Sequence, residues 1–181
     1  MLVKEVIGEC LVKLGKENFI DEAELTDEQQ ALVDRLLAAL NIAYKEAVTE
    51  FIPLYCEEDV TVNGGVIDVS GLSRRILYPV ALSSGGRARK VWVRPEGLSA
   101  DAEGRATLRY AYLPEDVTLS SDIADMRLTA GVLSDGVIGE YYLADKVFEL
   151  AEAYETSFRE ALSAVRYKGR PMTLGAGRWR G

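Results

Sequence analysis

Apolar residues in the first fifty positions recur at steps of three and four, which is the spacing of an amphipathic helix. We expect one helix over residues 3–14 and a second over about 27–52. Thr26 and Gln29 have the spacing of a capping box at the start of the second helix. Pro53 cannot continue that helix and should end it. The apolar stripes of the two helices are Val3, Val6, Ile7, Cys10, Leu11 and Leu14, then Val33, Leu36, Leu37, Leu40, Tyr44, Ala47, Val48 and Phe51.

Between residues 59 and 113 the apolar period shortens to two, the period of a half-buried strand. Asn63-Gly64-Gly65 separates two short apolar runs and is a strong hairpin signal. Ser83-Ser84-Gly85-Gly86 joins two further runs. The expected strands are residues 60–62, 66–69, 76–82, 89–94 and 106–113, with Leu108, Tyr110 and Tyr112 on one side of the last. This region predicts a small, mainly antiparallel sheet.

Residues 114–129 are acidic and serine-containing, and we expect a loop there. The helical period returns at Ser134 and predicts one long helix that ends at about Tyr167. Residues 169–181 are rich in glycine and arginine, and we expect a flexible basic tail. The buried face of the long helix should comprise Ile138, Tyr141, Ala144, Phe148, Ala151, Phe158, Leu162 and Val165.

These patterns predict an α+β fold over residues 1–168. The predicted form is a helical bundle of two N-terminal helices and a long C-terminal helix, with a mainly antiparallel β-sheet insertion at about 59–113. A chain of 181 residues suits one such domain.

The amino-acid composition argues against several classes of functional site. The sequence contains no histidine, which removes the commonest general acid–base group and the commonest metal ligand. Cys10 and Cys56 lie among apolar neighbours and are expected to be reduced core residues. We expect no cofactor and no metal site. No apolar run approaches the length of a membrane span, and the N-terminal residues do not resemble a signal peptide.

No catalytic constellation stands out, so we expect a protein that is not an enzyme, and an enzyme of unknown type is the least favoured hypothesis. The carboxylate pairs, such as Glu22 with Glu24 and Asp122 with Asp125, lie in acidic loops and indicate solvated surface. The glycine-rich segments lack the context of a phosphate or dinucleotide site. Without histidine, a serine or cysteine nucleophile would depend on a lysine base, and that alternative stays open.

Two basic clusters are candidate binding sites. The first lies on or beside the predicted hairpins and could be a protein interface, an ordinary solvated face or a nucleic-acid surface. Its residues, a possible subunit interface, are Arg74, Arg75, Arg87, Arg89, Lys90, Trp92 and Arg94. The second could be an inert end, a nucleic-acid contact, or a peptide that orders on a partner protein. Its residues are Arg166, Lys168, Arg170, Arg178, Trp179 and Arg180.

The order of elements resembles the head–tail connector (adaptor) family of tailed bacteriophages. Residues 3–15 and 31–53 look like the opening helical pair of that family, and residues 133–165 look like its closing helix. The resemblance implies a virion structural protein that forms a ring homo-oligomer beneath the portal. The C-terminal segment would reach onto the portal, and tail-completion proteins are further expected partners. The family has no enzymatic activity.

Charge is unevenly distributed along the chain. Residues 1–59 carry 5 basic and 14 acidic groups, whereas residues 161–181 carry 5 basic groups and no acidic ones. Opposite charges on different segments suit contacts between neighbouring copies. The net charge of −8 disfavours general nucleic-acid binding. A nucleic-acid-binding module that uses the basic sheet and tail is the main alternative.

Overall fold

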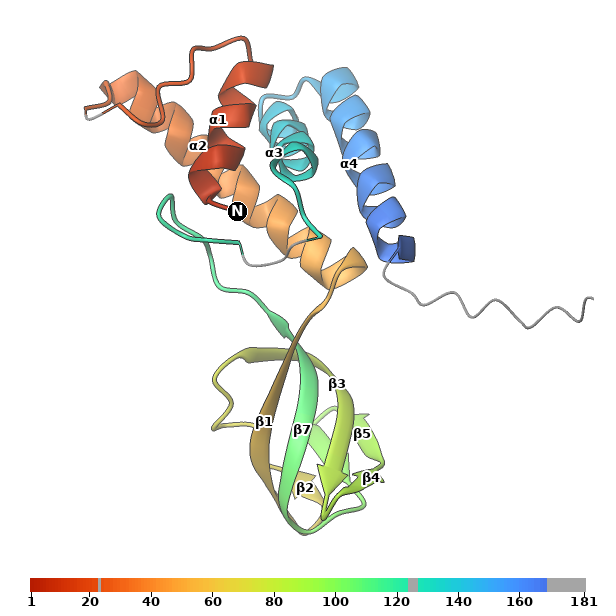
Figure 1. Ribbon diagram of the computed structural model, residues 1–181. Helices are drawn as coiled ribbons and strands as arrows, with labels where there is room; N and C mark the ends of the chain where they lie inside the picture. Colours follow the sequence, from red (N-terminus) through yellow and green to blue (C-terminus); the bar gives the residue numbers. More distant parts are fainter. Residues whose placement is uncertain (23, 124–126, 169–181) are drawn as a thin grey trace, which may run out of the picture. The chain divides into compact units, whose positions relative to one another are not determined.

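The computed structural model describes residues 1–22, 24–123 and 127–168, and within them the fold is α+β, as predicted (Figure 1). The α-helices are α1 (Val3–Lys13), α2 (Asp27–Glu46), α3 (Ala130–Ala144) and α4 (Phe148–Lys168), with a short π-helix, Ala47–Phe51, after α2. The strands are β1 (Leu54–Asn63), β2 (Val66–Ile67), β3 (Arg75–Ser84), β4 (Arg87–Arg89), β5 (Val91–Arg94), β6 (Gly97–Ala100) and β7 (Gly104–Leu113).

The chain divides into two compact units. The helical unit contains Met1–Tyr44 and the described residues from Val117 onward, and the sheet unit contains Lys45–Asp116. The predicted β-rich region, residues 59–113, lies within the sheet unit.

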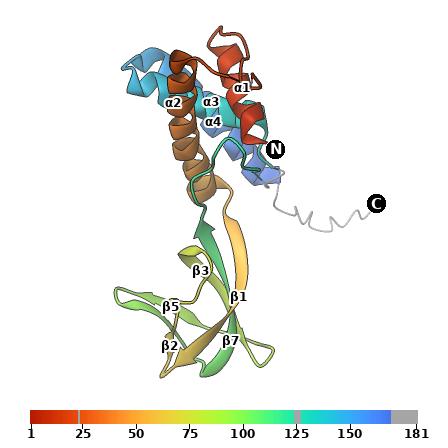
Figure 2. The ribbon, with the colours of Figure 1, turned by 90° about the vertical axis from the view of Figure 1, so that its left-hand side faces the viewer.

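In the helical unit α1 packs against α3, and α3 packs against α4 (Figures 1 and 2). The stripes predicted for α1 and α2 supply much of the core, because their residues fall on one side of each helix. Their fully or nearly buried members include Val3, Val6, Ile7, Cys10 and Leu11 from α1, and Val33, Leu36, Leu40 and Tyr44 from α2. The predicted capping box of α2 is confirmed: the Thr26 N–H donates to Gln29 Oε1 at 2.8 Å, and the Gln29 N–H donates to Thr26 Oγ1 at 3.3 Å.

The prediction of one long C-terminal helix is wrong. The chain turns back after Ala144, and α3 and α4 form an antiparallel pair. At the turn Lys146 has a φ of 62°, and the Val147 N–H donates to the carbonyl of Tyr142 at 2.9 Å. This bond is the long-range hydrogen bond of a Schellman C-cap, which normally places glycine at the left-handed position. Because lysine occupies that position here, the sequence carries no visible stop signal.

Two glycines of α3 face the helix that folds back on it. A Cβ on Gly136 would lie 2.9 Å from Phe158 Cζ, and one on Gly139 would lie 3.3 Å from the backbone nitrogen of Glu155. The absence of side chains at these positions lets α4 approach α3 closely. Phe158 and Leu162 are accordingly buried, as predicted, whereas Phe148 is 64% exposed and Ala144 is also exposed, contrary to prediction.

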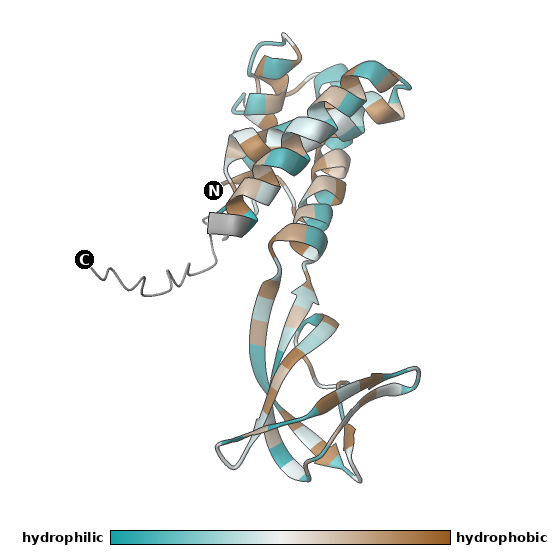
Figure 3. Cartoon of the chain, turned by 90° about the vertical axis from the view of Figure 1, so that its right-hand side faces the viewer, coloured by the Kyte–Doolittle hydropathy of each residue, from teal (hydrophilic) through white to brown (hydrophobic). Residues whose placement is uncertain are grey.

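All strand pairs of the sheet unit are antiparallel, and the strand order is β4-β3-β7-β1-β2-β6-β5. Both predicted hairpins form. Their turns are Gly64-Gly65 and Gly85-Gly86, and all four glycines have positive φ between 58° and 78°, as a type I′ turn requires. Figure 3 shows hydrophobic and hydrophilic residues alternating along these strands.

The sheet curls strongly. β5 stands at one end of the strand order but also lies beside β3, near the other end. The concave side encloses a core that includes Leu108 and Tyr110, which are fully buried, with Tyr112 packed against it, as predicted for one side of β7. Four details differ from prediction. β1 begins at Leu54 and not at residue 60, and β2 ends at Ile67 and not at residue 69. β6 was not expected, and residues 89–94 are split between β4 and β5 at Lys90.

Candidate interaction surface

Five of the seven predicted sheet residues lie along one continuous stretch. Arg87 and Arg89 belong to β4, Trp92 and Arg94 belong to β5, and Lys90 links the two strands. Among the described strands, β4 pairs with β3 alone and β5 pairs with β6 alone, so both are edge strands. We call this stretch, residues 87–94, the β4–β5 edge.

The other two predicted residues are elsewhere. Arg75 opens β3 and pairs with Leu113, whereas Ser84, at the opposite end of β3, pairs with Arg87. Nine residue steps along a strand correspond to about 30 Å. Arg74 precedes Arg75, and its guanidinium lies 5.7 Å from the ring centre of Tyr112. The structure therefore separates Arg74 and Arg75 from the β4–β5 edge.

The basic side chains of the β4–β5 edge are exposed and make no ion pair with any described residue. Arg109 in β7 shows the contrast. Its guanidinium lies 5.1 Å from the ring centre of Tyr55, and its Nε lies 3.7 Å from Glu57 Oε1. The positive charge of the β4–β5 edge is not neutralised within the described part of the chain, and a partner could neutralise it.

A hollow of about 230 Å³ adjoins this edge. Trp92 and Val66, which are 45% and 59% exposed, contribute its apolar surface, and Arg94 also lines it. Trp92 and Val66 are both register partners of Ser99, so the three side chains lie in one row across β5, β6 and β2. Ser99 Oγ is buried and has no hydrogen-bond partner among the described atoms. The hollow therefore combines an apolar platform and a guanidinium, beside a buried hydroxyl without a partner among the described atoms.

Sequence reasoning missed Val66 and Ser99 as parts of this surface. Leu98 and Ala100 are buried and alternate with Gly97 and Ser99, which gives β6 a strand period. That run is only four residues long, too short to stand out from the turns beside it.

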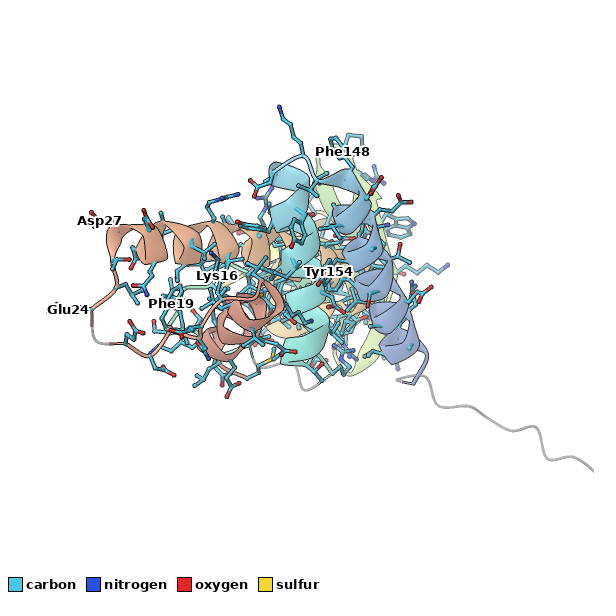
Figure 4. All side chains as sticks on the ribbon, turned by 90° about the horizontal axis from the view of Figure 1, so that it is seen from above. Lys16, Phe19, Glu24, Asp27, Phe148 and Tyr154 are labelled. Atoms are coloured by element: carbon cyan, nitrogen blue, oxygen red, sulfur yellow. The ribbon has the colours of Figure 1, made fainter. Side chains whose placement is uncertain are left out.

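A second hollow, of about 330 Å³, lies between α2 and α3 in the helical unit. Ile42 and Leu143 line it and are half exposed. Arg35 borders it, with its guanidinium 4.5 Å from the ring centre of Tyr141 and 2.5 Å from Asp145 Oδ1. Figure 4 shows Phe148 at the first turn of α4, where the unexpected helix break leaves it exposed.

One lysine lies beside a serine in the helical unit. Lys13 Nζ lies 2.7 Å from Ser134 Oγ, the spacing of a serine–lysine pair. However, Lys13 Nζ also donates to Asp135 Oδ1 at 2.6 Å and to the carbonyl of Gly131 at 3.2 Å. Three acceptors match the three protons of an ammonium group, which has no lone pair to accept a proton. Lys13 therefore links α1 to α3 through these three bonds.

The two cysteines lie in different units of the chain. Burial raises the pKa of Cys10 to about 12, so the thiol stays protonated at neutral pH. Cys56 is partly buried, and both cysteines are free, as predicted. Among the described residues, no three histidine, cysteine, aspartate or glutamate side chains gather where they could hold a metal ion.

One carboxylate of the sheet unit is strongly perturbed. Glu58 accepts hydrogen bonds from the Tyr110 hydroxyl, from Ser73 Oγ at 2.7 Å and from the Ser73 N–H at 3.0 Å. These bonds, that of Tyr110 first, lower the pKa of Glu58 to about 2. The pKa of Tyr110 is raised, chiefly by burial and then by Glu58. Because these bonds join β1, β7 and the loop before β3, we interpret the cluster as structural.

The predicted C-terminal cluster is only partly described. Arg166 is exposed on α4, and Lys168 is the last residue of that helix. Arg170, Arg178, Trp179 and Arg180, together with the predicted flexible tail, lie outside the described residues.

Comparison with known proteins does not assign the chain to a family. No protein-family model matches the chain, and no curated protein matches its sequence. Within the described residues, no helix is both long and apolar enough to cross a membrane.

Proposed function

We propose that this chain is a structural assembly protein of the phage head–tail connector type, which works by binding protein subunits. The observation that carries the proposal is the β4–β5 edge, where unpaired basic side chains adjoin an exposed apolar platform. Arginine and tryptophan are enriched at interface hot spots, and edge strands offer unpaired backbone groups to a partner. The sequence resemblance of residues 3–15 and 31–53 to the opening helical pair of the connector family is the ground for the connector type.

In this proposal the helices form the bundle of a connector subunit, and the sheet is an insertion within it. The chain would be a virion component and would form a ring of identical subunits. The C-terminal cluster, which begins with Arg166 and Lys168, would contact the portal protein. Tail-completion proteins would bind the assembled ring.

Affinity capture from lysate of phage-producing cells tests the proposal. Full-length chain is compared with a chain that ends at Lys168, and captured proteins are identified by mass spectrometry. We expect the full-length chain to capture a portal protein and the shortened chain to lose it. Capture of no virion protein by either form would contradict the proposal.

A nucleic-acid-binding module is the second candidate, and a specific observation favours it. Unpaired arginines next to an exposed tryptophan are the groups that neutralise phosphates and stack on bases. Fluorescence anisotropy with a labelled 20-nucleotide single strand would measure this binding. Affinity at physiological salt that falls steeply with added salt would support it, because phosphate contacts release counterions.

A further inference from the structure

The segment between α1 and α2 carries the charge opposite to that of the β4–β5 edge. We call residues 16–22 and 24–28 the acidic connector. Its carboxylates are all exposed, and Glu24 and Asp27 lie at the margin of the helical unit, away from α3 and α4 (Figure 4). The six carboxylates are those of Glu17, Asp21, Glu22, Glu24, Asp27 and Glu28.

Most of this negative charge is unpaired. Asp21 lies 3.3 Å from Lys4 Nζ, and the other five carboxylates make no ion pair with any described residue. Lys16 is the connector's one basic residue. Asp27 and Glu28 lie in the first turn of α2, where the helix dipole favours negative charge. The dipole does not occupy their carboxylates, which remain free to pair with a basic side chain.

The β4–β5 edge has the groups that would bind such a segment. Arg87, Arg89 and Arg94 can each donate two parallel hydrogen bonds to a carboxylate. Arg94 also lines the adjoining hollow, so a carboxylate bound there would meet its guanidinium. Trp92 and Val66 add apolar contact area that water covers in the isolated chain.

We propose that the acidic connector of one copy binds the β4–β5 edge and its hollow on a second copy. The proposal rests on the assembly function proposed above and names the surfaces that join identical subunits. The two surfaces belong to different units of the chain and differ from each other, so the contact is heterologous. A heterologous contact repeated from copy to copy builds a ring or an open filament.

Charge reversal on each side tests the contact. The sheet variant is Arg87→Glu with Arg89→Glu, and the connector variant is Glu22→Lys with Glu24→Lys. Sedimentation velocity at low salt measures self-association. Each variant alone places like charges in contact, and we expect its self-association to weaken about 100-fold, because like-charge juxtaposition costs several kcal/mol. An equimolar mixture of the two variants pairs opposite charges again and should recover the wild-type affinity within about threefold.

Matched controls change the same number of charges elsewhere. Arg74→Glu with Arg75→Glu reverses two basic residues at the far end of β3, and Glu152→Lys with Glu160→Lys reverses two exposed acidic residues of α4. Both controls should associate as the wild type does. In a Trp179→Phe background, Trp92 is the single tryptophan, and its emission should shift to the blue on association because the partner covers its ring.

Three outcomes would overturn the inference. They are a wild-type chain that stays monomeric at low salt, single variants that associate normally, and a mixture that fails to recover association. None of them bears on portal capture by the wild-type chain, so the failure of this contact is distinguishable from the failure of the proposed function.

Discussion

Lys13 Nζ lies 2.6 Å from Asp135 Oδ1, and this ion pair joins α1 to α3 across more than 120 residues of sequence. Ser157 Oγ donates to the second carboxylate oxygen at 2.9 Å, so Asp135 also joins α4 to the cluster. The side chains of Lys13 and Asp135 are 24% and 20% exposed, which limits screening by solvent. The cluster therefore contributes to the packing of three helices.

Substitution of Lys13 by methionine should destabilise the chain by about 1–3 kcal/mol, because it leaves a partly buried carboxylate short of donors. Urea denaturation followed by circular dichroism measures the change. The control is Lys4→Met, which removes an exposed pair with Asp21 and should cost less than about 0.5 kcal/mol. Equal losses of unfolding free energy in the two variants would show that Lys13 stabilises the chain no more than the exposed Lys4–Asp21 pair does.

Gly136→Ala should destabilise the chain by about 1–3 kcal/mol, because the new methyl group would overlap Phe158 and lie 3.0 Å from Ala43 Cβ. Gly131→Ala is the matched control, since its nearest neighbour is the flexible end of Glu9 at 3.3 Å. Thermal denaturation of both variants makes the comparison. Adding Phe158→Leu to Gly136→Ala should recover part of the loss, and no recovery would argue against the proposed overlap.

Lys146→Gly should stabilise the chain by about 0.5–1 kcal/mol, because glycine adopts the left-handed conformation without a Cβ penalty. Lys146→Ala retains that penalty and serves as the control for loss of the side chain. Guanidinium denaturation compares the three proteins. If the alanine variant gains as much unfolding free energy as the glycine variant, the effect comes from loss of the lysine side chain and not from the backbone conformation.

Stability should fall as the pH drops from about 4.5 toward 2, in part because of Glu58. Its folded-state pKa of about 2 lies below the ordinary value of 4.5, so its contribution is complete above 4.5 and is lost as the carboxylate becomes protonated. Tyr110→Phe removes the largest cause of this shift and should cost about 1 kcal/mol at pH 7. The difference in unfolding free energy between variant and wild type should be smaller at pH 2.5 than at pH 7. Urea denaturation at the two pH values measures this difference. An unchanged difference would contradict the role of Glu58.

The elements that local patterns define were predictable from the sequence. Periods of three and four residues identify α1 and α2, and the Thr26–Gln29 box identifies where α2 begins. The two glycine turns identify both hairpins, because few other residues adopt positive φ at both turn positions. The β4–β5 edge was also predicted as basic, since charge is read directly from the residues.

Features that depend on contacts between distant segments were decided by the tertiary structure alone. The break between α3 and α4 has no glycine signal at Lys146, and the close packing of Phe158 against Gly136 appears only once the two helices lie side by side. The separation of Arg75 from Arg87 follows from the length of β3, and the hollow beside Trp92 forms only when β2, β5 and β6 come together. Sequence periodicity reports how each segment divides its own surface between core and solvent, but which distant surfaces meet depends on the packing of the whole chain.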